Sequence, residues 1–199
     1  AVLPEEVKQL PTYTATELVD EVVEKIGTFG RPIVVLSGGN PLLWDLKPFI
    51  TQLRQSLSQE VEIQVETQGT VWRPWLELVD HVVISPKPPS SGMKTDWIQL
   101  AKFISLTGDV GTQWSLKVVV FNDEDLDYAF EIADTFCGSG THFFISCGTL
   151  PTDTRETLLE RYRQLIDRTL KYPQDLRRQY IIRILPQTHV LVWGHAKGV

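Results

Sequence analysis

Two hydrophobic periodicities alternate along the chain and predict a succession of helices and strands. Apolar residues at helical spacing predict a helix capped by Thr14 and further helices at about 48–57, 96–103 and 123–133, with the longest following Thr152. Short apolar runs or strict alternation predict the strands, which are Ile33–Leu36, 61–65, His81–Ile84, 116–121 and 143–145. We expect Ile181–Leu185 and 190–193 to close the chain as extended segments.

Strands that alternate with helices indicate parallel pairing through right-handed crossovers, so the predicted fold class is α/β. About six strands are too few for a complete eight-stranded barrel. A doubly wound sheet and an incomplete barrel fit the pattern equally well. In both architectures ligands bind at the carboxyl ends of the strands, which directs attention to the loops that follow them.

Composition narrows the class of protein. The 199 residues are 42% hydrophobic and 22% charged, as expected for one soluble domain over 1–199. The net charge of −6 leaves no basic excess for nucleic acid, and no apolar run reaches the ~20 residues of a membrane span. Two cysteines, Cys137 and Cys147, are too few for a disulfide scaffold, which favours a reducing cytoplasm. They form no Cys-x-x-Cys pair, and buried packing is the better prediction for both.

The first of four polar strand ends holds Ser37, Gly38, Gly39 and Asn40. Its two glycines allow a ligand to approach the backbone closely, and exposed N–H groups could hold a carboxylate or phosphate. The spacing matches neither of the common glycine-rich nucleotide loops. The alternative is a tight strand-to-helix turn.

The second and third strand ends carry Glu66 and Lys87. Glu66 ends a strand, where it could point either to solvent or into a site. Lys87 lies among three prolines that restrict its backbone, which makes it a candidate for binding an anion, although a rigid surface loop is the alternative.

The fourth strand end carries Gln187 and His189. The histidine could serve as acid, base or ligand, or simply be hydrogen-bonded. Because all four motifs follow strands, where the fold rule expects a ligand, they predict binding of a polar small molecule that carries a carboxylate. The residues alone do not define a reaction.

Read together, the motifs resemble those of a known family. The segment 36–41 resembles the Gly-Gly-Glu-Pro region of radical S-adenosylmethionine enzymes, with Asn40 in place of the glutamate. In their order, spacing and amino-acid sequence, the segments at 65–70, 85–93, 185–194 and 197–199 resemble 7-carboxy-7-deazaguanine synthases. The resemblance extends from about Ser37 to Val199.

This resemblance implies a carbon–nitrogen lyase of queuosine and 7-deazapurine biosynthesis. Its reaction would contract 6-carboxy-5,6,7,8-tetrahydropterin to 7-carboxy-7-deazaguanine with release of ammonia. The implied cofactors are a [4Fe-4S] cluster, S-adenosylmethionine and Mg²⁺, with electrons from a flavodoxin or similar reductase. The implied structure is an incomplete (β/α)6-type barrel in a cytoplasmic homodimer. Whether the product serves tRNA or DNA modification stays open.

The resemblance also implies residue roles, which fall into two groups. Residues on the cofactor side would contact S-adenosylmethionine; these are Gly38, Gly39, Asn40, Glu66, Ser85, Lys87 and Ser146. The glycine loop would hold the amino group of its methionine, Lys87 would contact its carboxylate, and Ser146 would lie near its adenosine. Residues on the substrate side would line the pterin; these are Ser37, Gln187 and His189.

Two departures from the family pattern stand out. Asn40 keeps an acceptor oxygen but lacks the charge of the glutamate. The Cys-x-x-x-Cys-x-x-Cys cluster loop is absent, and Cys137 with Cys147 cannot replace three closely spaced thiolates. The chain starts at Ala1 and its single methionine is Met93.

We therefore expect this chain to be the larger C-terminal part of such a synthase. The first strand, the cluster loop and the magnesium ligand would precede Ala1, and no catalytic residue is identified in the chain itself. Two alternatives remain. One is a module that binds S-adenosylmethionine or a pterin without a cluster, and the other is a different radical enzyme on the same scaffold.

Overall fold

The computed structural model describes residues 12–27, 30–57, 60–172 and 180–194. Its centre is one sheet of six strands, all of them parallel. The strands are β1 (Ile33–Leu36), β2 (Glu62–Thr67), β3 (His81–Ile84), β4 (Gln113–Val120), β5 (His142–Cys147) and β6 (Ile181–Leu185). Each predicted strand is present. The structure extends the second at its end, the fourth at its start and the fifth at both ends.

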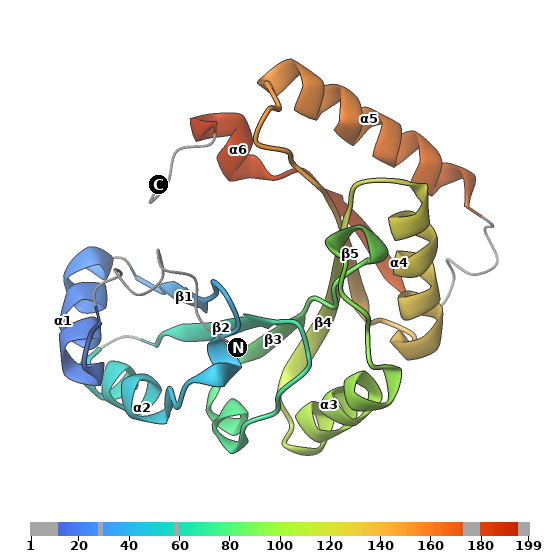
Figure 1. The fold of residues 1–199 in the computed structure, drawn as a ribbon. Coiled ribbons are helices and arrows are strands. Elements are labelled where there is room, and N and C mark those ends of the chain that lie inside the picture. Colours follow the sequence, from blue (N-terminus) through green and yellow to red (C-terminus); the bar gives the residue numbers. More distant parts are fainter. Residues whose placement is uncertain (1–11, 28–29, 58–59, 173–179, 195–199) are drawn as a thin grey trace.

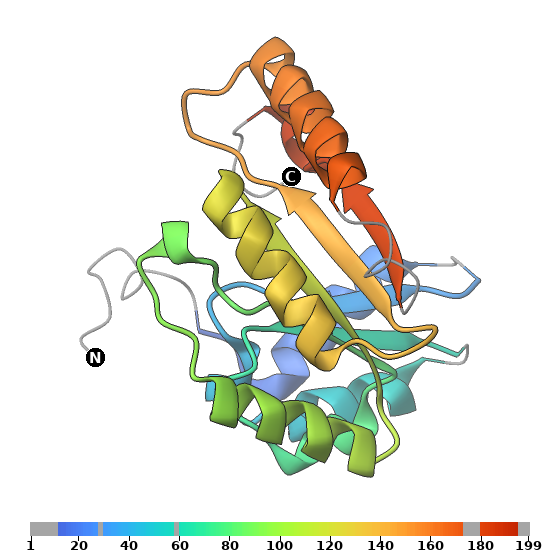
Figure 2. The ribbon, with the colours of Figure 1, turned by 90° about the vertical axis from the view of Figure 1, so that its right-hand side faces the viewer.

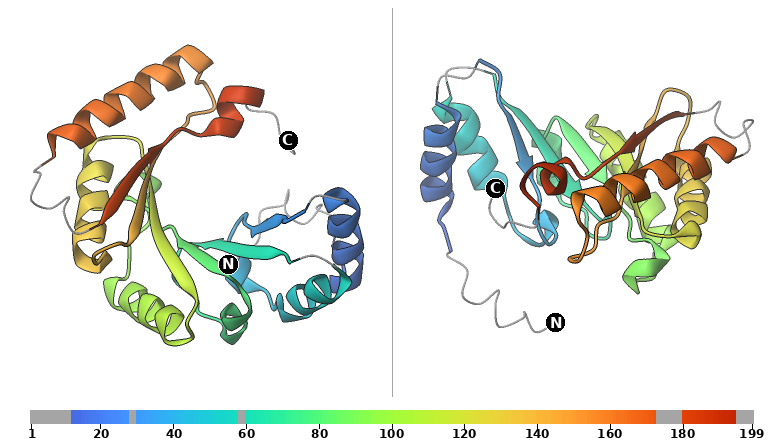
Figure 3. Two further views of the ribbon diagram at one scale, coloured as in Figure 1. Left: turned by 180° about the vertical axis from the view of Figure 1, so that it is seen from behind. Right: turned by 90° about the horizontal axis from the view of Figure 1, so that it is seen from above.

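The order of strands in space is the order in sequence, β1 to β6. A doubly wound sheet reverses its order at a switch point, and this sheet does not. Instead the sheet curves into an open barrel whose edge strands, β1 and β6, lie on opposite sides of a gap (Figure 1 and Figure 3). Of the two architectures compatible with the sequence pattern, the structure therefore has the incomplete barrel.

Helices cover the outer, convex side of the sheet (Figure 1 and Figure 2). They are α1 (Ala15–Ile26), α2 (Lys47–Ser56), α3 (Trp97–Asp109), α4 (Asp123–Phe136) and α5 (Arg155–Lys171). The short α6 (Thr188–Trp193) follows β6 and lies beside the gap of the open barrel (Figure 1). Their first turns agree with the sequence signals. Thr14 and Glu17 form a capping box at α1, and Thr154 caps α5, which is the longest of these helices.

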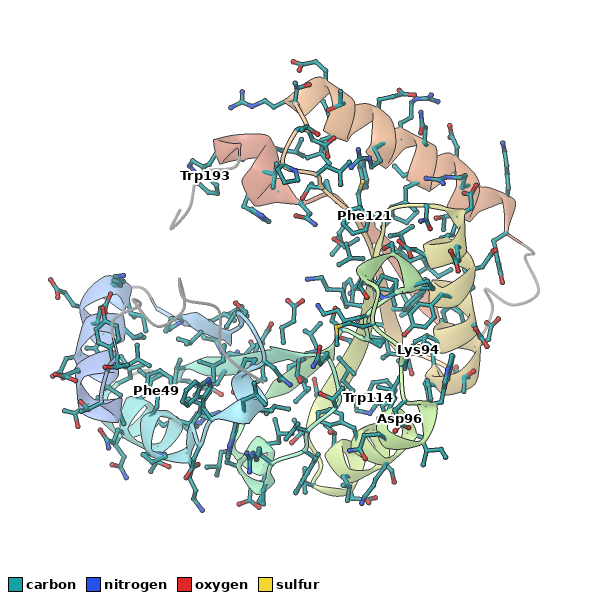
Figure 4. All side chains as sticks on the ribbon, viewed as in Figure 1. Phe49, Lys94, Asp96, Trp114, Phe121 and Trp193 are labelled. Carbon is teal, nitrogen blue, oxygen red and sulfur yellow. The ribbon has the colours of Figure 1, made fainter. Side chains whose placement is uncertain are left out.

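The expectation of an extended segment at 190–193 is wrong, because these residues belong to α6. A run of four apolar residues has no periodicity that separates a strand from one helical turn. The helical turn is instead defined by backbone hydrogen bonds at its start and by a glycine at its end. Both Val190 and Leu191 donate their N–H groups to the Gln187 carbonyl, and Gly194 ends the helix at a positive φ of 66°. Of the apolar residues only Val190 is buried, whereas Trp193 is 55% exposed (Figure 4).

Alternation along the strands divides the sheet into two faces. One face packs against the helices and forms the core; its fully buried members include Ile63, Val65, Val82, Ile84, Leu116, Val118, Phe143 and Ile145. The other face lines the inside of the open barrel and carries polar side chains; among them are Glu66, Lys117, His142 and Arg183. This interior face also carries exposed apolar side chains such as Val35 and Leu185, and it is available for a ligand because the core lies on the other side of the sheet.

Among the described residues, none of the helices combines the length and apolar character that a membrane span needs.

Candidate functional site

A small cavity of about 140 Å³ lies at the carboxyl ends of β1, β2 and β3. Its lining consists of Ser37, Gly38, Gly39, Glu66, Thr67, Gln68, Ser85 and Lys87. The strand register explains this convergence, because Leu36 pairs with Val65 and Thr67 pairs with Ile84, so the three strands end at nearly the same level. Six of the residues proposed from the sequence therefore lie around one cavity.

The glycine loop presents open backbone to this cavity. Gly38 has a φ of +96°, a conformation that L side chains rarely adopt. A Cβ atom built at Gly38 or Gly39 would meet no atom within 4 Å, so the space beside both residues is free. The backbone of this loop is therefore open to the cavity, and ligand binding at it stays a prediction.

Asn40 has a structural role in the same loop. Its side chain is buried, and Oδ1 accepts hydrogen bonds from the Leu42 N–H group at 3.3 Å and from the Thr67 hydroxyl at 3.0 Å. These bonds cap the short helix η2 (Pro41–Leu43) and tie the glycine loop to the end of β2. Asn40 is not among the residues that line the cavity. Its contact with a methionine amino group stays a prediction.

Ser85 and Lys87 enter the cavity from the loop after β3. Ser85 is buried, and its N–H group donates to the Thr67 carbonyl at 2.6 Å, which continues the pairing of β2 with β3. Lys87 is half-buried. Within the part of the chain that the structure describes, its ammonium group has no hydrogen bond or ion pair, so its charge is available for an anion.

Glu66 points onto the interior face of the sheet, which decides between the two orientations left open by the sequence. Both of its carboxylate oxygens accept hydrogen bonds from Lys117 Nζ on β4, at 2.9 and 3.0 Å. The sequence interpretation missed Lys117. The available signal was a charged residue inside the otherwise apolar run 116–121, because a lysine is not expected at a buried core position of a strand.

Three of the proposed residues lie away from this cavity, on β5 or beyond β6. Ser146 is buried on β5, where it pairs with Leu185 of β6. Gln187 accepts a hydrogen bond from the Thr149 hydroxyl at 2.9 Å, and His189 is exposed on α6. The last strand β6 and the helix α6 lie across the gap of the open barrel from β1 (Figure 1). The roles assigned to these three residues stay predictions.

Neither cysteine is suited to bind a metal. Both are buried, as predicted, and burial raises the pKa of Cys137 to about 12 and also raises the pKa of Cys147. Metal ligation needs thiolates, which these environments disfavour. Among the described residues, no three His, Cys, Asp or Glu side chains are grouped so that they could hold a metal ion. The cysteines of this chain therefore do not fit an iron–sulfur cluster.

Similarity to characterised proteins decides the family. The 7-carboxy-7-deazaguanine synthase of Bacillus cereus is 36% identical over 197 residues, covering 96% of this chain and 78% of the relative. The synthase of Bacillus subtilis strain 168 is also 36% identical, over 201 residues and 79% of its length. The chain belongs to the 7-carboxy-7-deazaguanine synthase family. A more distant member from Pyrobaculum aerophilum is 27% identical over 90% of the chain. No family model matches the chain.

Solved structures support the fold assignment within radical S-adenosylmethionine enzymes. Streptococcus suis SuiB bound to S-adenosylmethionine aligns with a TM-score of 0.55 at 13% identity, over 85% of this chain and 42% of SuiB. The enzyme anSMEcpe with bound AdoMet gives 0.54 at 14% identity, over 84% and 54% of the two chains. These matches confirm the partial barrel, and the family assignment confirms the predicted enzyme class.

Proposed function

We propose that this chain carries the S-adenosylmethionine- and substrate-binding residues of a 7-carboxy-7-deazaguanine synthase. The reaction is the contraction of 6-carboxy-5,6,7,8-tetrahydropterin to 7-carboxy-7-deazaguanine with loss of ammonia. The observation that carries the proposal is the cavity formed by the glycine loop, Glu66, Ser85 and Lys87. It lies at the carboxyl ends of the strands, where parallel α/β folds place their ligands.

The cavity fits the methionine end of S-adenosylmethionine. Lys87 supplies a cation for the carboxylate, and the open backbone at Gly38 and Gly39 leaves room for the amino acid. When bound and reductively cleaved, S-adenosylmethionine supplies a 5′-deoxyadenosyl radical that removes a hydrogen atom from the substrate. Ser85 completes the cofactor side, and Ser37 faces the pterin.

The remaining assignments extend the site across the open barrel. Ser146 contacts the adenosine, while Gln187 and His189 line the pterin side. The proposal further includes a cytoplasmic homodimer, Mg²⁺ and a flavodoxin-like electron donor. The residues of this chain do not supply the cluster, because its two cysteines are buried and separated.

The 199-residue chain by itself is expected to be colourless and to bind no stoichiometric iron, because cluster assembly needs closely spaced thiolates. Iron and sulfide are measured after anaerobic reconstitution with ferrous iron and sulfide. Stoichiometric iron together with cluster absorbance would show that Cys137 and Cys147 can take part after all.

Formation of 5′-deoxyadenosine separates a radical enzyme from a module that only binds ligands. The protein expressed anaerobically from its complete natural reading frame is reduced with dithionite in the presence of S-adenosylmethionine. The synthase proposal predicts 5′-deoxyadenosine and a reading frame that contains three cysteines at cluster spacing. Absence of both would identify a binding module instead.

A further inference from the structure

The ion pair between Glu66 and Lys117 spans two strand spacings inside the barrel. Glu66 on β2 is level with Val83 on β3, which is level with Ser115 on β4, and Lys117 lies two residues further along β4. Neighbouring strands are about 4.8 Å apart, so the pair crosses about 10 Å of sheet above Val83. A long, flexible lysine side chain can bridge this distance. The geometry holds Glu66 toward the centre of the interior face.

The pair remains accessible to a ligand. The side chains of Lys117 and Glu66 are 26% and 33% exposed, and Glu66 also lines the cavity beside the glycine loop. A carboxylate offers about four lone-pair positions, of which Lys117 uses two. The unused positions can accept hydrogen bonds from a molecule in the barrel.

The charge of the pair indicates which chemical group it suits. Glu66 is already neutralised by Lys117, so it is a poor anchor for the ammonium group of methionine. It is well suited to neutral N–H donors, such as the amino and ring N–H groups of a pterin. Lys87, by contrast, has no ion-pair partner among the described residues and suits an anion. The two lysines therefore favour different ligands.

We propose that Lys117 is a positioning residue for the substrate, holding Glu66 across the interior face so that its carboxylate accepts hydrogen bonds from the N–H groups of the pterin. This inference rests on the proposed function and assigns Glu66 to the substrate rather than to S-adenosylmethionine. A partly exposed ion pair contributes little to folding. Replacement of Lys117 should therefore change ligand binding more than stability.

The test is a fluorescence titration with 6-carboxypterin, a stable oxidised relative of the substrate, on the protein prepared anaerobically from its complete natural reading frame. We expect K117M to weaken binding about tenfold or more, the size of a hydrogen bond to a charged group. K117R should bind within about threefold of wild type, because a guanidinium group can contact both carboxylate oxygens. E66Q should weaken binding as K117M does, and the double variant should add little to either.

Two controls separate positioning from a structural role. S-Adenosylmethionine affinity, measured by calorimetry, should be the same in K117M and wild type. Lys102→Met removes a charge from an exposed position on α3, on the helix side of the sheet, and should leave 6-carboxypterin affinity unchanged. Thermal unfolding of each variant verifies that the fold is intact.

The outcomes distinguish this inference from the proposed function. Equal 6-carboxypterin affinity in wild type and K117M overturns the inference and leaves the proposed function standing. Equal loss of both ligands in K117M, or failure of K117R to restore binding, also overturns it, because Lys117 is then structural. A wild-type protein that binds S-adenosylmethionine but not 6-carboxypterin contradicts the substrate assignment in the proposed function and, with it, this inference.

Discussion

Replacement of Lys87 by alanine is expected to weaken S-adenosylmethionine binding by about 1.5–3 kcal/mol, which is about 10–150-fold in the dissociation constant. The side chain reaches the cavity beside the glycine loop, and within the described residues its ammonium group has no other partner. Pro86 and Pro88 restrict the backbone on both sides, so little ordering is required on binding. Calorimetry on the protein from its complete reading frame measures the effect.

Lys94→Ala is the matched control for this experiment. Lys94 is exposed seven residues further along the same segment, and it lines a neighbouring hollow with Trp97 and Tyr128 instead of the glycine-loop cavity. Its removal should leave the dissociation constant within about twofold of wild type. An unchanged dissociation constant in the Lys87→Ala variant would remove Lys87 from the site.

Replacement of Asp125 by alanine is expected to reduce the free energy of unfolding by about 2–5 kcal/mol. The Asp125 side chain is fully buried on α4. Its Oδ1 accepts a hydrogen bond from the Ser90 N–H group at 3.0 Å, and its Oδ2 accepts one from the Phe121 N–H group at 2.9 Å. These two donors belong to the loops after β3 and β4, and each would lose its partner.

Urea unfolding of the variant measures this loss. Asp127→Ala serves as the control, since Asp127 is exposed on the same helix and its removal should change stability by no more than about 0.5 kcal/mol. Because Ser90 lies in the loop that carries Lys87, the folded Asp125→Ala protein should also bind S-adenosylmethionine more weakly. Unfolding free energies that agree between Asp125→Ala and wild type would contradict this account of the loop.

The sequence pattern was sufficient to locate the strands, because most of them are either short continuous apolar segments or segments in which apolar residues alternate strictly with polar ones. It could not distinguish a barrel from a doubly wound sheet, since the two differ in which strands are neighbours and not in their hydrophobic periodicity. The order β1 to β6 is a tertiary property that required the structure. The helix at Thr188–Trp193 escaped prediction because one turn leaves no periodic signal.

For the site, the rule that ligands bind at carboxyl strand ends selected Gly38, Glu66 and Lys87 correctly as neighbours. Their proximity follows from the parallel pairing of β1 with β2 and of β2 with β3. The alternation of helices and strands in the sequence already implied parallel pairing. The role of Asn40 as a buried cap and the pairing of Glu66 with Lys117 could not be inferred in this way. Both depend on side-chain contacts between segments that are far apart in sequence.

The most direct test of the central claim is formation of 7-carboxy-7-deazaguanine. The protein from its complete natural reading frame is prepared anaerobically and incubated with 6-carboxy-5,6,7,8-tetrahydropterin, S-adenosylmethionine, Mg²⁺ and a reductant, and the products are separated and identified by mass spectrometry. The account predicts 7-carboxy-7-deazaguanine together with ammonia. A protein that cleaves S-adenosylmethionine but leaves the pterin unchanged would contradict it.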